Sequence, residues 1–125
     1  MTAAKRRAWQ RGRWAETLVV LGLRLTGHRV LARRYRTPVG EIDIVARRRK
    51  TLVFVEVKYR AAAGDTAAAL GPRQRARIAR AAGLFIAHHP EYADDSMRFD
   101  VILAARGRWP RRIKDAWQVE VQDRR

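Results

Sequence analysis

The 125-residue chain contains no cysteine, which excludes disulfide bonds and thiolate metal sites and leaves the redox compartment open. It also lacks a long apolar run, because the stretch from Leu18 to Leu25 is short and is broken by Arg24. The basic segment MTAAKRRAWQRGR is followed by no clean apolar core and no small-residue cleavage site. We therefore predict neither a signal peptide nor a membrane span, and by default a cytoplasmic protein.

Acidic residues are scarce, with 12 Asp and Glu against 28 Lys and Arg, and the formal net charge is +16. Such an excess attracts polyanions through phosphate contacts and counterion release, which makes nucleic acid the first-choice partner. An anionic membrane surface fits less well, because no long amphipathic helix carries cations on one face and large apolar residues on the other. Only four of the 28 basic residues are lysines, a bias that a GC-rich genome can also produce on solvated surfaces.

The length fits one domain over residues 1–125, with residues 1–11 as a flexible basic N-terminus. Trp14, Leu18, Leu21 and Leu25 have helical spacing and Gly27 is a stop signal, which predicts a first helix over 11–27. Strands are predicted at 28–37, 41–47 and 52–60, with the last two joined in a hairpin by the basic connection RRRK.

Pro72 is well placed to open a second helix that ends before Pro90. Ile78, Ala82 and Phe85 share one face of that helix, and RFDVILAA then predicts a further strand. The segment IKDAWQVEV is ambiguous between a short strand and irregular structure. The expected fold is α/β, with a central mixed β-sheet flanked by helices in the order α-β-β-β-α-β.

Charged residues interrupt the apolar hairpin strands. Glu56, Lys58 and Arg60 share a face with Leu52 and Phe54, and the opposite face is also apolar, so this strand is expected to be covered on both sides. Glu41 and Asp43 are expected on one face of the preceding strand, with Ile42 and Ile44 on the other.

Hairpin pairing of Asp43 with Glu56 or its neighbour would place the two acids about 5 Å apart, an unfavourable arrangement without a cation between them. Mg²⁺ is usually held by one or two carboxylates with waters and substrate phosphate. Lys58, about 7 Å along the same strand face from Glu56, would then reach the water or the phosphate. The alternative is a structural Glu56–Lys58 ion pair, with Asp43 satisfying turn amides.

The stretch GEIDIVARRRKTLVFVEVKYR resembles the signature of the YraN-like family in the PD-(D/E)xK nuclease superfamily, which includes restriction endonucleases and archaeal Holliday junction resolvases. Gly12 and Glu16 match the family's G-x-x-x-E, and RFDV at 98–101 matches its late strand. The resemblance implies a restriction-endonuclease-like core, with Asp43 and Glu56 as metal ligands and Lys58 as the catalytic lysine. Its first-helix glutamate corresponds to Glu16, which we expect to be partly buried rather than on the helix edge.

Two positions depart from the superfamily pattern. Ile42 stands where the superfamily name has proline, and Gln74 stands where the family commonly has lysine. Phosphate contacts near position 74 are therefore expected from neighbouring arginines.

We expect an endonuclease that uses Mg²⁺ or Mn²⁺ to cleave phosphodiester bonds in DNA, including branched or recombination and repair intermediates. The alternatives are a non-catalytic nucleic-acid-binding protein that kept the scaffold and an RNA-associated or ribosome-associated protein. The sequence is compatible with a homodimer as well as a monomer. The expected catalytic residues are Glu16, Asp43, Glu56 and Lys58, and further site candidates are Glu41, Arg60 and Gln74. The expected nucleic-acid contacts are Arg33, Arg34, Arg36, Arg47, Arg48, Arg49, Arg73, Arg75 and Arg77.

Overall fold

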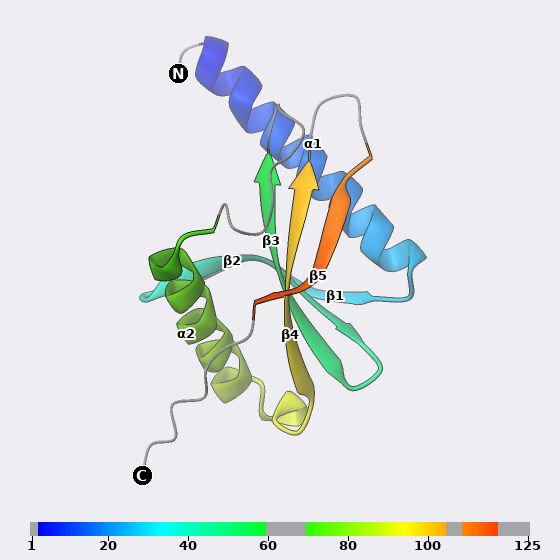
Figure 1. Ribbon diagram of the computed structural model, residues 1–125, viewed down its shortest axis with the longest axis vertical. Coiled ribbons are helices and arrows are strands. Elements are labelled where there is room, and N and C mark those ends of the chain that lie inside the picture. The colour runs from blue at the N-terminus through cyan, green and yellow to red at the C-terminus, as the bar shows by residue number, and fades with distance from the viewer. Residues whose placement is uncertain (1–2, 60–69, 105–108, 118–125) are drawn as a thin grey trace.

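The computed structural model describes residues 3–59, 70–104 and 109–117, with side chains from Trp14 onward in the first helix. The elements are α1 Ala3–Leu25, β1 Arg29–Thr37, β2 Gly40–Arg48, β3 Thr51–Tyr59, α2 Pro72–His88, η2 Pro90–Tyr92, β4 Ser96–Ala104 and β5 Arg111–Trp117 (Figure 1). The expected order α-β-β-β-α-β is confirmed, and the ambiguous C-terminal segment contributes a fifth strand. The first helix begins at Ala3, so residues 3–11 of the expected flexible N-terminus are helical.

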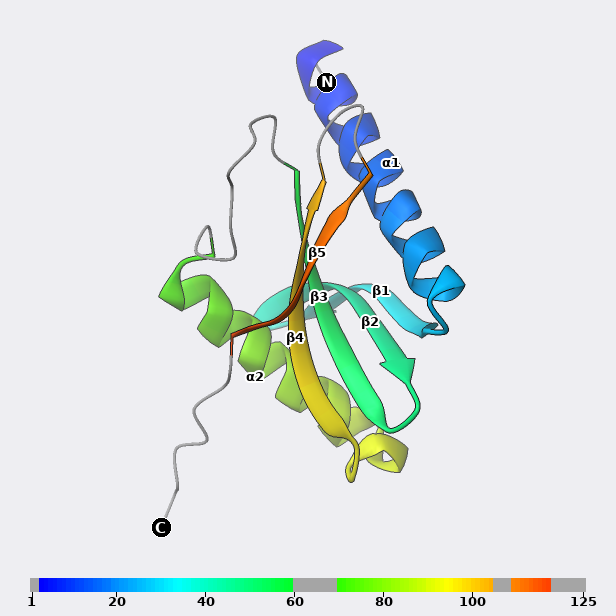
Figure 2. The same ribbon diagram turned by 45° about the vertical axis from the view of Figure 1, so that its right-hand side comes forward.

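The five strands form one mixed sheet in the order β1-β2-β3-β4-β5. Strands β3 and β4 are parallel, joined through α2, and all other neighbours are antiparallel. The sheet lies between the two helices, with α1 on one face and α2 on the other (Figure 2). The central strand β3 is therefore covered on both sides, as its two apolar faces predicted.

The α2 face of the sheet holds the larger core. Ile78 and Phe85 of α2 pack with Leu52, Phe54 and residues of β2, β4 and β5. Phe54 is fully buried and its ring lies 6.1 Å from that of Phe85, edge to face. The predicted apolar face of the second helix is confirmed, and it fixes where the N-terminal turn of α2 lies along β3.

The α1 face has a smaller core built from branched aliphatic residues. Val19, Val20 and Leu23 pack against Val53 and Val55 of β3. The predicted apolar stripe of this helix is wrong, because Trp14 and Leu25 on it are 56% and 73% exposed. The helix has apolar residues on two sides, and the side with β-branched and small residues lies against the pleated sheet. Neither described helix has an apolar stretch long enough to cross a membrane.

Side-chain alternation breaks in the middle of β2. Ile42 packs in the α2-side core, whereas Ile44 packs in the α1-side core, although the two residues are only two positions apart. The expectation that Ile42 and Ile44 share a face is therefore wrong. The break lies at Asp43, and on β1 the residue between the partners of Ile42 and Ile44 is Arg34, whose φ is 50°. An irregularity of this kind re-aims side chains within a strand.

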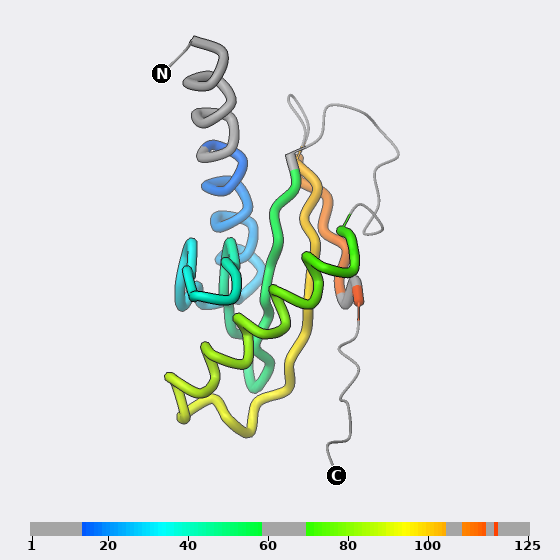
Figure 3. The backbone as a smooth tube through the Cα atoms, turned by 90° about the vertical axis from the view of Figure 1, so that its left-hand side faces the viewer, coloured from blue at the N-terminus to red at the C-terminus, as the bar shows by residue number. Residues whose placement is uncertain are grey.

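The tip of the β1–β2 hairpin lies beside α2 (Figure 3). A Cβ on Gly40 would lie 2.9 Å from the carbonyl oxygen of Arg77, so only glycine allows this approach. The contact brings the start of β2 to the N-terminal half of α2, next to the end of β3.

Candidate functional site

Asp43 and Glu56 lie where β2 and β3 separate. The β2–β3 ladder ends at the pair Ile44–Val55, and the same register continued by one residue places Asp43 opposite Glu56. Beyond the ladder, the backbone N–H of Val57 donates to Asp43 Oδ2 at 2.8 Å. The Asp43 carboxylate thus replaces a strand partner and is fixed next to Glu56, which is 8% exposed.

Burial raises the pKa of both acids and is the largest cause for each. The charge of Asp43 raises the pKa of Glu56 further, to about 8, against the opposing effect of Lys58. At Asp43, the charges of Glu16 and Glu41 add to the rise in pKa, whereas the Val57 N–H and an interaction with Glu56 oppose it. A cation at this pair would therefore compete with a proton on Glu56.

Gln74, in the first turn of α2, joins Glu56 to Lys58. Its Nε2 donates to Glu56 Oε1 at 3.1 Å, and its Oε1 accepts from Lys58 Nζ at 3.3 Å. The amide holds the ammonium group through a neutral contact, beside the carboxylate pair. Gln74 was a candidate from the sequence, but its bridging position depends on the packing of α2 on β3 and has no local signal.

Glu16 is buried, as expected, and it faces the sheet from α1. Its two carboxylate oxygens accept from Arg33 Nε at 3.1 Å and Arg34 Nε at 3.4 Å. Its charge also raises the pKa of Asp43, so the two carboxylates lie within electrostatic range of each other. Four elements, α1, β2, β3 and α2, thus bring together Glu16, Asp43, Glu56, Lys58 and Gln74.

Glu41 and Arg60 are the two remaining site candidates, and only Glu41 is among the described residues. Glu41 is 44% exposed and forms an ion pair with Arg36 across the hairpin at 3.6 Å, while its charge raises the pKa of Glu56. Arg60 lies outside the described residues.

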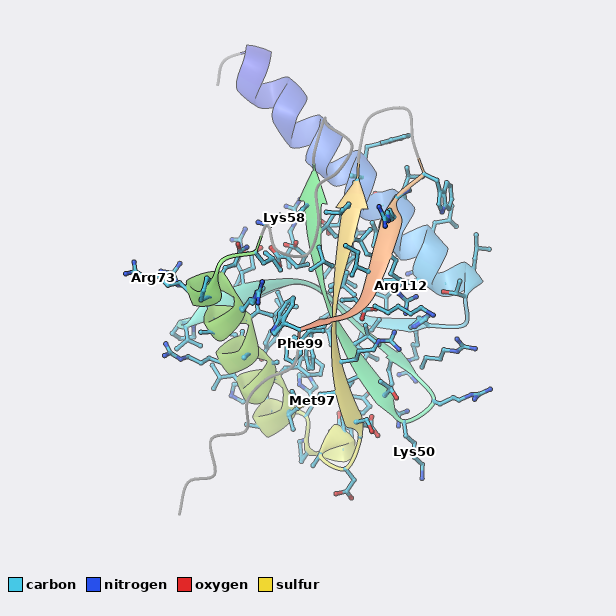
Figure 4. All side chains as sticks on the ribbon, in the orientation of Figure 1. Lys50, Lys58, Arg73, Met97, Phe99 and Arg112 are labelled. Carbon is cyan, nitrogen blue, oxygen red and sulfur yellow. The ribbon has the colours of Figure 1, made fainter. Side chains whose placement is uncertain are left out.

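The expected nucleic-acid-binding arginines fall into two groups. Those of β1 and the start of α2 lie on the side of the carboxylate pair: Arg33, Arg34, Arg36, Arg73, Arg75 and Arg77. Arg47, Arg48 and Arg49 lie at the other end of β2, and Arg48 is roughly 16 Å along the strand from Asp43. Lys58 and Lys50 mark the two ends of β3 in the same way (Figure 4). The guanidinium of Arg47 is paired with Asp95 through Nε, at 2.6 Å from Oδ2, and through Nη2, at 3.2 Å from Oδ1, so two of its nitrogens are already engaged.

The carboxylate ligands at this site fit a hard divalent cation that takes only one or two of its ligands from the protein. Among the described residues, no group of three His, Asp or Glu side chains is arranged to hold a metal ion. Asp43 and Glu56 supply two neighbouring carboxyl groups, and the charge of Asp43 raises the pKa of Glu56. Mg²⁺ and Mn²⁺ are bound in this way, by one or two carboxylates with the remaining positions left to water and phosphate.

A second polar cluster lies on the α1 face, away from this pair. Asp100 of β4 is fully buried and accepts from Arg98 Nε and Arg112 Nε, each at 2.9 Å. Burial and the charge of Arg112 lower the pKa of His28, whose Nε2 lies 3.4 Å from Arg112 Nη2. This cluster was not predicted from the sequence, although an acid within the apolar run FDVIL was a usable signal. Its contacts join β4, β5 and the segment after α1.

Comparison with known proteins shows which family this chain matches. The model of the uncharacterised protein family UPF0102 matches residues 15–104, which contain every residue of the candidate site. A UPF0102 protein of Parvibaculum lavamentivorans is 51% identical over 111 residues, covering 89% of this chain and 84% of that protein. A UPF0102 protein of Maricaulis maris is 47% identical over 117 residues, covering 94% and 92%. One of Methylorubrum extorquens is 46% identical over 118 residues, covering 94% and 92%.

Proposed function

We propose that this chain, which belongs to the uncharacterised protein family UPF0102, is a Mg²⁺-dependent or Mn²⁺-dependent endonuclease of the PD-(D/E)xK superfamily. The observation that carries the proposal is the pair of half-buried Asp43 and buried Glu56, with Lys58 two residues after Glu56 on the same strand. The net charge of +16 supports a nucleic-acid substrate, and DNA is favoured. Branched or recombination and repair intermediates are the proposed structures.

Asp43 and Glu56 would hold the cation. When bound, it supplies an activated water and offsets negative charge on the scissile phosphate. Asp43 contributes a carboxylate whose position is fixed by the Val57 N–H, so little reorganisation is needed during binding. Glu56 contributes the second carboxylate, oriented by Gln74 Nε2.

Lys58 supplies the positive charge that the substrate meets. Its ammonium contacts the neutral Gln74 oxygen at 3.3 Å and lies close enough to Glu56 to lower the pKa of that acid. A compact ammonium in this position can bind a phosphate oxygen or orient the attacking hydroxide. The exposed arginines Arg36, Arg73 and Arg77 surround this end of the sheet and attract the nucleic-acid backbone.

The test is cleavage of a substrate panel by the purified protein with Mg²⁺ or Mn²⁺. The panel contains linear, single-stranded and branched DNA and the corresponding RNA. Metal-dependent strand breaks that disappear with EDTA support the proposal. Binding of the panel without cleavage of any member contradicts it.

A second candidate is a nucleic-acid-binding protein without catalytic activity, acting on DNA, RNA or the ribosome. It is favoured because, among the described residues, no three acidic or histidine side chains are arranged to hold a metal ion together. The charge alone would suffice for such a role. Under this reading, Asp43→Asn and wild type bind nucleic acid alike and no metal changes the affinity.

A further inference from the structure

Two consecutive arginines of β1 point to the same acid. Neighbouring residues of a regular strand project to opposite faces, yet both Arg33 Nε and Arg34 Nε donate to Glu16. The cause is the backbone of Arg34, whose φ of 50° turns its side chain back toward α1. A left-handed residue with a long side chain inside a strand is disfavoured, so the surrounding structure must hold it there.

The two guanidinium groups use only part of their donor capacity. Each gives its Nε to Glu16, and neither makes a further hydrogen bond to another described residue. The Arg33 and Arg34 side chains are 44% and 40% exposed, whereas that of Glu16 is 10% exposed. The Glu16 carboxylate is therefore the buried member of the group, and it carries one negative charge against the two positive charges of the partly exposed arginines.

This pair of arginines lies directly beside the candidate metal ligands. On β1, Arg33 pairs with Ile44 and Tyr35 with Ile42, which leaves Arg34 opposite Asp43 on the neighbouring strand. Adjacent strands are about 5 Å apart, so an anion on the arginines would lie next to the carboxylate pair.

We infer that Arg33 and Arg34 form a phosphate-binding subsite for the nucleic-acid backbone, positioned by Glu16 beside the Asp43–Glu56 pair. Guanidinium groups bind phosphate through paired N–H donors, and a group already fixed through its Nε loses little freedom when its terminal nitrogens bind. The identity of the ligand as a substrate phosphate next to the scissile one rests on the proposed function. Glu16 acts here as a positioning residue.

The experiment measures the affinity of a fluorescein-labelled DNA single strand and duplex, by anisotropy, over a series of salt concentrations without divalent metal. The variants are Arg34→Asn, because asparagine tolerates a positive φ, and Arg33→Gln. Each should bind roughly tenfold more weakly at low salt, and the slope of log K against log salt should fall by about one phosphate contact. Thermal melts confirm that each variant is folded.

Arg29→Gln is the matched control. Arg29 is an exposed arginine of the same strand, but it lies at the other end of β1, where it pairs with Arg47. It should keep the wild-type slope. An unchanged slope in both subsite variants, or an equal loss in Arg29→Gln, overturns the subsite.

A second arm separates backbone phosphate from free anion. Melts with inorganic phosphate, against chloride at equal ionic strength, should show stabilisation in wild type that Arg34→Asn loses. Phosphate stabilisation combined with unchanged DNA slopes overturns the assignment to a nucleic acid. Wild type that shows the predicted slopes but cleaves nothing would refute the nuclease proposal alone, whereas wild type that binds no DNA refutes both.

Discussion

The backbone N–H of Val57 donates to Asp43 Oδ2 at 2.8 Å, at the point where the β2–β3 ladder has ended. The Asp43 side chain takes the place of a backbone acceptor on a neighbouring strand, and this hydrogen bond fixes its position. The same bond holds the carboxylate against Glu56, whose pKa rises to about 8. The site is therefore built at the point in the sheet where β2 and β3 stop pairing.

The raised pKa of Glu56 predicts a loss of stability with increasing pH in the metal-free protein. Between the ordinary value of 4.5 and about 8, the folded protein binds a proton that the unfolded chain has released. The free energy of unfolding should therefore fall through this range, by an amount on the order of a few kcal/mol. Glu56→Gln, which resembles the protonated acid, should remove most of the fall. Urea unfolding in EDTA across this pH range is the measurement, and parallel curves for wild type and variant would contradict the shift.

Divalent cations should stabilise the protein most at pH above 8, where no proton competes for Glu56. Saturation at about a hundred times the dissociation constant would add about 2.7 kcal/mol, which is a shift of several degrees in Tm for a domain of this size. Asp43→Asn and Glu56→Gln should lose the shift. Glu91→Gln, which changes an exposed acid in η2, should keep it. Equal metal shifts in all four proteins would place any cation elsewhere.

Lys58→Arg tests the lysine. The variant keeps the positive charge and should fold and bind DNA, but its planar guanidinium cannot occupy the position of a compact ammonium beside Gln74. We expect single-turnover cleavage to fall roughly a hundredfold or more. Lys50→Arg, at the other end of β3, is the control and should cleave like wild type. Wild-type cleavage by Lys58→Arg would refute a catalytic role.

Two glycines test the packing that positions the site, with opposite signs. Gly40→Ala should destabilise the fold by about 1–3 kcal/mol, because its Cβ would lie 2.9 Å from the Arg77 carbonyl oxygen. Gly83→Ala should stabilise it by about 0.5–1 kcal/mol, because Gly83 is an α2 residue with no atom within 4 Å of an added Cβ. Chemical denaturation measures both. A neutral Gly40→Ala would show that the hairpin tip does not depend on this contact.

The sequence predicted the elements and most of the site because those features are local. Alternation within TLVFVEVKY placed Glu56 and Lys58 on one covered face, and the short turn set the register that brings Asp43 opposite Glu56. The errors in the buried face of α1 and in the alternation of β2 have different causes. The first helix has two apolar sides, so spacing alone does not identify the buried one.

In β2, the face of Ile44 depends on an irregularity opposite Arg34 that no period-two pattern contains. The contacts of Gln74 with Glu56 and of Glu16 with two arginines are likewise tertiary. They follow from how α1 and α2 pack on the sheet, and only the presence of Glu16 and Gln74 could be read from the chain.

The most direct measurement is the single-turnover cleavage rate of wild type and Asp43→Asn on the panel of DNA and RNA, with Mg²⁺, with Mn²⁺ and with EDTA. Asparagine keeps an oxygen for the Val57 N–H, so the variant should fold and bind nucleic acid. We predict metal-dependent cleavage by wild type, with DNA preferred, and a loss of roughly a hundredfold or more in Asp43→Asn. Equal cleavage by both proteins, or binding without cleavage by wild type on every substrate and metal, would contradict the account.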